Sequence, residues 1–173
     1  MMKTKNIILV GMPGSGKSTL GILLAKKIHY GYIDSDSVIV AQKGKLLPEL
    51  IEELGNEGFL DLEAQVNGSL SVNRCVIATG GSAIYRGDVI EKMKENGIVV
   101  YLKIPYDEVE KRLGDLKKRG VVLKEGYTLK DLYEERAPLY ELHADYIIEL
   151  NESSVENSAE KIRRTILPAL SEE

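Results

Sequence analysis

A glycine-rich stretch near the start of the chain has the residue types and spacing of a phosphate-binding loop. The sequence GMPGSGKST, residues 11–19, fits the pattern G-x-x-x-x-G-K-[ST]. Glycines let backbone N–H groups curl around a phosphate, and the helix that begins there adds partial positive charge. Lysine and serine at the last positions suit the β- and γ-phosphates and Mg²⁺. We expect a nucleoside triphosphate to contact Gly11, Gly14, Ser15, Gly16, Lys17, Ser18 and Thr19.

Two aspartates lie two positions apart in YIDSD, at the end of a short apolar run. Because side chains alternate faces along a strand, Asp34 and Asp36 point the same way if the strand continues through both. Nearby carboxylates are unfavourable unless a cation, a hydrogen-bond donor or a proton lies between them. A helix cap at Asp36, a metal site and a substrate site are the alternatives. The phosphate-binding loop favours the last two.

Sequence signals of two other classes of P-loop protein are missing. The chain contains neither an Asp-x-x-Gly turn nor an Asn-Lys-x-Asp string, both of which GTPases use. The third apolar run ends in ATGGS, without the carboxylates that motor-type ATPases carry. Small P-loop kinases are the class that remains, and the two aspartates supply acid chemistry for them.

Apolar, β-branched runs alternate with segments of helical period along the chain. The runs occupy residues 6–10, 32–34, 75–79, 98–104 and 145–150. Strand followed by helix, repeated in this way, predicts an α/β fold of three layers, in which helices cover both faces of a five-stranded parallel sheet. No repeat or linker divides the sequence, so we expect a single domain over residues 1–173.

Two segments interrupt this alternation. Residues 35–62 hold more helix than one crossover needs, and residues 114–126 carry four cationic side chains among three glycines. A solvated loop is the simplest interpretation of the second segment. In a nucleotide-binding protein it also suits a mobile lid over phosphates.

Composition narrows the functional classes. The chain of 173 residues has a net charge of −4 with both signs interspersed, which argues against a nucleic-acid-binding surface. A lone cysteine excludes a disulfide framework and a thiolate metal cluster. No stretch has the length of a membrane span, and the N-terminus lacks a secretory cleavage pattern. We expect a cytoplasmic protein that binds no nucleic acid or membrane and works as a monomer.

Several motifs together resemble the shikimate kinase family. They follow the family's order and spacing over nearly the whole chain: the phosphate loop, YIDSD, NEGFLDLE, ATGGSAI, KRLGDLKKRG and ERAPLY. The resemblance implies a nucleoside-monophosphate-kinase-like core with a substrate-binding helical segment at about 35–62 and a lid at about 112–126. It also implies that ATP, with Mg²⁺, phosphorylates a ring hydroxyl of shikimate, the 3-position in that family, in aromatic amino acid biosynthesis.

The resemblance further implies roles for side chains at the two acidic and glycine motifs. It assigns Asp34, with Ser18, to the Mg²⁺ shell. It assigns Asp36 to the acceptor hydroxyl, from which this carboxylate takes the proton. The backbone of Gly80 and Gly81 is implied to contact the acceptor, a small hydroxy acid.

Three arginines match functional arginines of the family. Arg136, in ERAPLY, matches the residue that holds the acceptor carboxylate. Arg119 matches the lid arginine that closes on the phosphates, and Arg112 matches the one that stacks on adenine. The catalytic group implied by the resemblance is therefore Lys17, Asp36 and Arg119.

Three positions depart from the family pattern. Leu60 stands where the family has an arginine that also binds the acceptor carboxylate, Ser82 replaces the third glycine of a Gly-Gly-Gly string, and Gly120 replaces a proline in the lid. Losing one charge-assisted hydrogen bond costs about 1.5–3 kcal/mol. A kinase for another small polyol acid (gluconate-like) or for a nucleoside monophosphate, and a nucleotide sensor without an acceptor, therefore stay open.

Other polar side chains have simple structural interpretations. Asp61 and Glu63 are expected to be solvated or to cap a helix, and Tyr133 and Tyr140 to pack. Apart from the resemblance, Arg136 fits equally well as a partner in a surface ion pair with helical neighbours.

Overall fold

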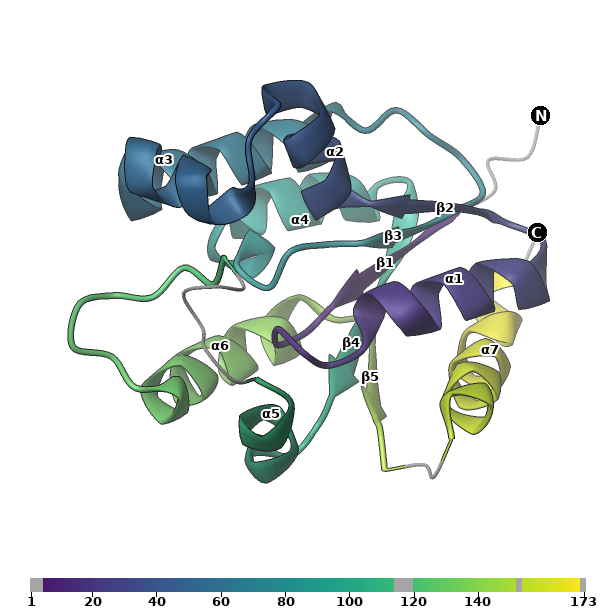
Figure 1. The fold of residues 1–173 in the computed structure, drawn as a ribbon. Coiled ribbons are helices and arrows are strands. Elements are labelled where there is room, and N and C mark those ends of the chain that lie inside the picture. The colour runs from purple at the N-terminus through teal and green to yellow at the C-terminus, as the bar shows by residue number, and fades with distance from the viewer. Residues whose placement is uncertain (1–4, 114–119, 152–153, 172–173) are drawn as a thin grey trace.

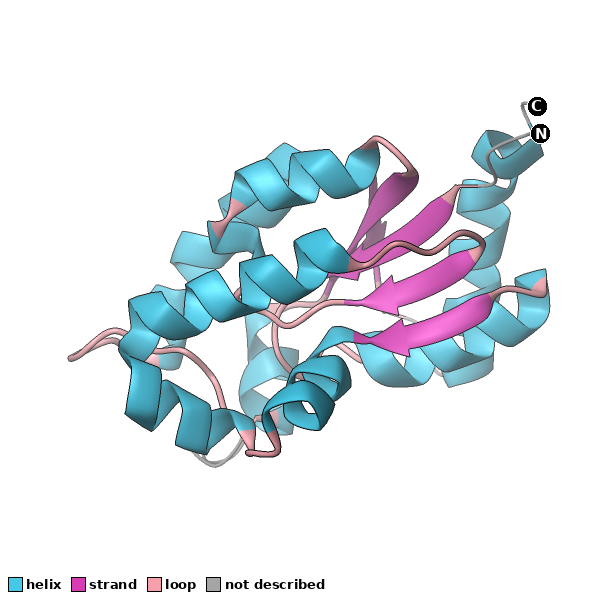
Figure 2. Ribbon diagram, turned by 90° about the horizontal axis from the view of Figure 1, so that it is seen from above, coloured by secondary structure: helices cyan, strands magenta, loops and turns pink. Residues whose placement is uncertain are grey.

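The computed structural model describes residues 5–113, 120–151 and 154–171. Its five strands form one sheet in the order β2-β3-β1-β4-β5, and every neighbouring pair is parallel. The strands are β1 (Asn6–Val10), β2 (Gly31–Asp34), β3 (Cys75–Ala78), β4 (Gly97–Lys103) and β5 (Tyr146–Glu149). Helices cover both faces of this sheet (Figures 1 and 2). The predicted α/β fold is therefore confirmed.

Seven α-helices lie in the described part of the chain. They are α1 (Lys17–Ile28), α2 (Ser35–Lys43), α3 (Leu47–Ser69), α4 (Gly87–Lys94), α5 (Tyr106–Arg112), α6 (Leu129–His143) and α7 (Val155–Ser171). Helices α1 and α7 pack together, and α4 packs against α3 and α6. Not one of the helices in the described ranges is long and apolar enough to cross a membrane.

Strand β1 is buried along its whole length, and apolar from Ile7 to Val10, because helices cover both faces of the sheet. All five residues of NIILV are buried, and β1 lies between β3 and β4 with Ile7 opposite Val76 and Ile98. Continuous apolar runs of this kind are typical of parallel sheets, whereas sheets with one solvated face alternate. The pattern fixes β1 in the centre of the sheet, and the loop that follows it lies at the carboxyl edge.

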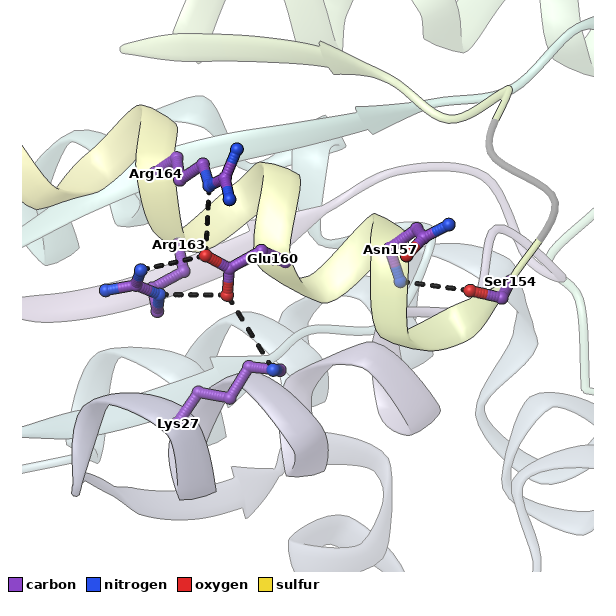
Figure 3. Close-up of polar contacts among 6 residues, drawn as sticks. All are labelled: Lys27, Ser154, Asn157, Glu160, Arg163 and Arg164. Carbon is purple, nitrogen blue, oxygen red and sulfur yellow. Dashed lines mark hydrogen bonds and ion pairs between the residues drawn. The ribbon is translucent and has the colours of Figure 1, made fainter.

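An ion-pair cluster joins α7 to α1 (Figure 3). Oε2 of Glu160 lies 3.7 Å from Nζ of Lys27 on α1. Arg163 and Arg164 also donate to this carboxylate, and their hydrogen bonds lower the pKa of Glu160 to about 2. The cluster is partly exposed, so it contributes less to helix packing than the buried side chains between the two helices.

Helices α2 and α3 form the segment that interrupted the strand–helix alternation. Gly55, with φ 69°, breaks the helical geometry of α3 near its first third. The two helices enclose a small apolar cluster that also takes in a residue from the segment after α5: Ile39, Leu50, Phe59, Leu60, Leu62, Val66 and Val122. The segment is thus a packed unit, and it places the end of α3 next to the loop after β3.

Candidate active site

The loops after β1, β2 and β3 meet at one edge of the sheet because these three strands are parallel neighbours. A cavity of about 490 Å³ lies at this edge, in the position where open α/β sheets bind ligands. Its lining includes most of the residues singled out in the sequence: Gly14, Gly16, Lys17, Ser18, Thr19, Asp34, Asp36, Gly81, Arg112 and Arg136.

The glycine-rich loop has backbone conformations and close contacts that a residue with a Cβ atom would disfavour. Gly14 and Gly16 have φ of 78° and 93°, and a Cβ on Gly11 would lie 2.8 Å from the carbonyl oxygen of Leu102. Nζ of Lys17 donates to the carbonyl of Gly11 at 2.7 Å. Burial lowers the pKa of Lys17 to about 8, and the nearby charge of Asp36 opposes that shift. The loop therefore presents backbone N–H groups and one ammonium group to the cavity.

Strand β2 ends at Asp34, and the chain turns directly into α2. Oδ1 of Asp34 accepts the backbone N–H of Ser37 at 3.1 Å, so Asp34 caps this helix. Asp36 lies in the first turn of α2. The strand ends at Asp34, as the apolar run at 32–34 predicted, so it does not continue through both aspartates. The capping interpretation of Asp36 is wrong, because the cap of α2 is Asp34, two residues earlier.

Asp34 and Ser18 form an oxygen pair at the cavity. Oγ of Ser18 donates to Oδ2 of Asp34 at 2.8 Å, and both residues line the cavity. A hydroxyl and a carboxylate are the ligand types that Mg²⁺ prefers, and this ion keeps several water or phosphate ligands besides. Within the described residues, no group of three or more His, Cys, Asp or Glu side chains is placed to hold a metal. The pair therefore suits a cation that arrives with phosphates.

Asp36 is a partly buried carboxylate on the cavity wall. Burial and then the charge of Asp34 raise its pKa to about 6, and Lys17 opposes the shift. A Cβ on Gly80 would lie 2.8 Å from Oδ1 of Asp36, so the loop after β3 runs directly behind this carboxylate. A carboxylate of raised pKa is a better proton acceptor than an ordinary one, provided that it is ionised.

Arg136 reaches the cavity from α6, and its residue is only 1% exposed. Nε donates to the hydroxyl of Tyr85 at 3.2 Å, and Nη2 donates to the carbonyl of Val122 at 2.9 Å. Nη1 lies 3.0 Å from the position that a Cβ on Gly81 would take. The surface ion-pair interpretation is therefore wrong, because these contacts hold the guanidinium inside the protein and against the glycine loop.

Tyr140 lies one helical turn after Arg136 and supports the same loop. Its hydroxyl donates to the carbonyl of Gly81 at 2.5 Å, and its ring stacks on Tyr101 with centroids 5.0 Å apart. Burial raises the pKa of Tyr140 to about 12. Tyr140 packs as expected, but its hydrogen bond to Gly81 was not predicted, because sequence does not reveal which carbonyl lies opposite a buried phenol.

Glu63 is buried, contrary to the expectation that it is solvated. It is 1% exposed, and its Oε2 accepts a hydrogen bond from Oγ of Ser82 at 2.6 Å. Burial raises the pKa of Glu63 to about 7. Its spacing was an available signal, because Glu63 follows Phe59 by four residues and precedes Val66 by three, which places it on the apolar face of α3.

A second cavity, of about 320 Å³, lies on the other side of the phosphate loop. It shares Gly16, Thr19 and Arg112 with the first cavity and continues to Ser154 and Ser158, before and on α7. Nη1 of Arg112 donates to the carbonyl of Gly14. The guanidinium is therefore held against the phosphate loop, and Arg112 lines both cavities.

The described end of the predicted lid lies over the first cavity. Gly120, Val121 and Val122 belong to its lining, and Nδ2 of Asn56 on α3 donates to the carbonyl of Leu123 at 3.0 Å. These contacts attach the segment to the region predicted to bind substrate. Residues 114–119, and with them Arg119, lie outside the described residues.

Comparisons with known proteins agree with this geometry. A sequence model of the shikimate kinase family matches residues 13–167. The chain is 36% identical to the shikimate kinase of Clostridium beijerinckii over 172 residues, or 98% of each chain. It is 38% identical to that of Shewanella frigidimarina over 94% of this chain and 96% of the relative. The chain belongs to the shikimate kinase family.

Solved structures place the fold in the same family. A shikimate kinase from Acinetobacter baumannii in complex with shikimate superposes with a TM-score of 0.87 at 37% identity, covering 96% of each chain. A gluconokinase from Sinorhizobium meliloti reaches a TM-score of 0.57 at 15% identity, covering 98% of this chain and 97% of that one. The second likeness is one of fold alone, so the comparisons favour the shikimate kinase family over the gluconate-like alternative.

The positions that depart from the family pattern differ in their surroundings. Leu60 is 5% exposed in the apolar cluster of α2 and α3 and does not belong to the cavity lining. Ser82 does line the cavity. Gly80 lies against the side chains of Asp36 and Glu63 and does not belong to the cavity lining, whereas Gly81 does.

Proposed function

We propose that the protein transfers the γ-phosphoryl group of ATP to the 3-hydroxyl of shikimate, a step of aromatic amino acid biosynthesis. One observation carries the proposal: Lys17 of the phosphate loop, the carboxylate of Asp36 and the guanidinium of Arg136 line the same cavity. A cation for phosphate, a proton acceptor and a cation for a carboxylate are the groups that this reaction needs. Membership of the shikimate kinase family supports the same acceptor.

ATP is proposed to bind along the phosphate loop. Backbone N–H groups of residues 11–19 and the amino end of α1 contact the phosphates, with Lys17 at the β- and γ-phosphates. Adenine occupies the second cavity and stacks on Arg112, whose place in the lining of both cavities supports this assignment. Ser18 and Asp34 would hold Mg²⁺, Asp34 directly or through water. When bound, Mg²⁺ neutralises charge on the phosphate oxygens.

The acceptor is proposed to lie between Asp36 and Arg136. Arg136 pairs with the acceptor carboxylate, and the backbone of Gly80 and Gly81 contacts the ring. Asp36 orients the reacting hydroxyl and takes its proton as the oxygen attacks the γ-phosphorus. The bond from that phosphorus to the bridging oxygen then breaks, and ADP leaves. Most of the rate enhancement comes from positioning and charge neutralisation, because phosphoryl transfer needs little covalent assistance.

We also propose roles for the two inserted segments. Residues 35–62 form the acceptor-binding segment of a single domain, and residues 112–126 form a lid. Arg119 completes the catalytic group when the lid closes, which excludes water from the phosphates. The protein is proposed to act as a monomer, because one chain supplies all these groups, and in the cytoplasm, where ATP is available.

An acceptor panel tests the proposed function. ADP release from MgATP is measured in a coupled assay with shikimate, quinate, gluconate or nucleoside monophosphates as acceptor. We expect turnover with shikimate and a much lower kcat/KM with every other acceptor. Preferred turnover of gluconate or of a monophosphate contradicts the proposal, and ATP binding without turnover of any acceptor indicates a nucleotide sensor.

A further inference from the structure

Ser82 combines two properties that bear on ligand binding. Its residue lines the cavity, and its Oγ donates to the buried carboxylate of Glu63 at 2.6 Å. A serine hydroxyl carries one proton and two lone pairs. Because the proton is held by Glu63, Oγ offers only lone pairs to a ligand. It therefore accepts a hydrogen bond from a ligand hydroxyl and repels a ligand carboxylate.

Oxygen atoms that accept hydrogen bonds lie close together on this side of the cavity. A Cβ on Gly80 would lie 2.1 Å from Oε1 of Glu63 and 2.8 Å from Oδ1 of Asp36, so two carboxylates converge behind the wall that Ser82 continues. Oε1 of Glu63 is buried and has no hydrogen-bond partner among the residues that the structure describes. Lys17 and Arg136 also line the cavity, and their positive charges act on Glu63. This wall, which is rich in hydrogen-bond acceptors, is thus suited to the hydroxyl groups of a ligand.

We propose that Ser82 binds a second hydroxyl of the acceptor, next to the hydroxyl that Asp36 binds, and that Glu63 sets the direction of this hydrogen bond by holding the Ser82 proton. The inference rests on the proposed function and deepens it: the preferred substrates are rings with two neighbouring hydroxyls. Ser82 is then a specificity residue. Glu63, which does not line the cavity, is a positioning residue that acts through Ser82.

A cycle of enzyme and substrate variants tests the role of Ser82. Wild type and Ser82→Ala are compared with shikimate and with two analogues, each lacking one of the hydroxyls that is not phosphorylated. We expect Ser82→Ala to raise KM for shikimate about fivefold to tenfold, the effect of one hydrogen bond, without changing KM for ATP. With the analogue that lacks the contacted hydroxyl, the substitution has no further effect.

A control variant separates this contact from the loss of any hydrogen-bonded serine hydroxyl. Ser69 donates to the carbonyl of Val66 at 2.8 Å at the far end of α3, away from this cavity. Ser69→Ala is expected to leave KM for shikimate and for ATP unchanged. The thermal midpoint of each variant is measured first, so that kinetic constants are compared only between folded proteins.

Substitutions of Glu63 test its positioning role. Glu63→Gln keeps an oxygen that accepts the Ser82 proton, so KM for shikimate stays within about twofold of wild type. Glu63→Leu removes it, frees the Ser82 hydroxyl to rotate, and raises KM as Ser82→Ala does. The double variant Glu63→Leu/Ser82→Ala is no worse than Glu63→Leu alone, because the two side chains act through one contact.

The outcomes distinguish the two levels of the proposal. If wild type phosphorylates shikimate but Ser82→Ala leaves its KM unchanged, the role of Ser82 is overturned and the proposed function stands. Equal losses with shikimate and with both analogues also overturn that role. If wild type leaves shikimate unphosphorylated, the proposed function is contradicted, and this inference with it. Should Glu63→Leu fail to fold, the Ser82→Ala cycle still decides the question.

Discussion

At the scale of single residues, the two aspartates of YIDSD separate because the strand ends between them. Asp34 caps α2 and accepts the hydroxyl of Ser18, whereas Asp36 lies in the first helical turn, on the cavity wall. A helix rotates its side chains by a different amount from a strand, so the two carboxylates need not face each other. This arrangement supports the proposed roles of Asp34 at a cation and of Asp36 at the acceptor.

Replacing the acid of Asp36 tests its role as proton acceptor. We expect Asp36→Asn to lower kcat by about 10²- to 10⁴-fold, the contribution of a general base, while the affinity for ATP is kept. Steady-state kinetics and nucleotide titration measure the two effects. Asp61→Asn is the control, since Asp61 pairs with Arg86 outside the cavity and its side chain is 73% exposed. An unchanged kcat in Asp36→Asn contradicts the assignment.

Leu60 offers a test of how the acceptor carboxylate is held. An arginine at position 60 would lie three residues before Glu63, whose Oε1 has no hydrogen-bond partner in the described part of the chain. We expect Leu60→Arg to lower KM for shikimate about tenfold through a charge-assisted hydrogen bond. The free energy of unfolding falls by about 2 kcal/mol, because a buried leucine is lost from its cluster.

The control for this substitution is Leu54→Arg, which changes a 43%-exposed leucine of the same helix. That variant is expected to change neither KM nor stability appreciably. A raised KM in Leu60→Arg would indicate that the pocket has repacked around leucine and uses Arg136 as its sole anchor for the carboxylate.

At the scale of elements, α6 is the helix that contacts the loop after β3 at Gly81. It begins with a capping box in which Thr128 and Asp131 bond each other's backbone N–H groups. Arg136 and Tyr140 lie one turn apart on its buried face, and both contact the loop at Gly81. The helix thus couples Arg136, the proposed carboxylate anchor, to the backbone of Gly81, because both are held by one rigid element.

Removing one hydroxyl on α6 tests this coupling. Tyr140→Phe loses the hydrogen bond to Gly81 but keeps the ring stacked on Tyr101. We expect KM for shikimate to rise about threefold to tenfold, while KM for ATP stays the same. Tyr133→Phe is the matched control, because Tyr133 donates to the carbonyl of Ile104, away from the cavity. Equal effects of the two substitutions would refute a specific role of α6 at this loop.

At the scale of the whole molecule, burial of Glu63 couples the site to stability. Burial raises its pKa from 4.5 to about 7, so the folded protein binds this proton more tightly than the unfolded chain does. The contribution to stability is fully present below pH 4.5 and is lost as the pH rises through 7. Above that pH, the buried charge makes the protein less stable than a neutral side chain would.

An uncharged replacement of Glu63 reveals this cost. Relative to wild type, Glu63→Gln should gain unfolding free energy as the pH rises from 4.5 to 8, by about 3 kcal/mol in total. Urea unfolding at several pH values measures the difference. Glu57→Gln, at a side chain that is 82% exposed, serves as control and should show no such trend. A difference that does not vary with pH would mean that Glu63 is ionised in the folded protein throughout this range.

The order of elements and the phosphate loop could be predicted because both depend on local pattern. Apolar runs of strand length, separated by segments of helical period, admit few arrangements other than a parallel sheet with crossover helices. The predicted strand at 6–10 coincides with β1, and that at 98–104 differs from β4 by one residue at each end. The glycine-rich loop is equally local, since its glycines, lysine and serine are consecutive or nearly so.

Which charged side chains are buried, and which groups they hydrogen-bond to, was decided by the tertiary structure. Glu63 and Arg136 are charged residues in helices, and charge alone favours a solvated position for both. Glu63 is buried because the loop after β3 brings Ser82 against it, 19 positions along the chain. Arg136 is buried by Tyr85 and Val122, which come from two other segments.

The sequence by itself therefore determined the class of fold, the phosphate loop and the pair of aspartates, each through residues that are neighbours in the chain. The tertiary structure alone decided that Asp34 rather than Asp36 caps the helix, and that Ser82, which lines the cavity, donates a hydrogen bond to the buried Glu63. The reason is physical: a hydrogen bond or a buried charge depends on what folds against a residue, and long-range packing sets that.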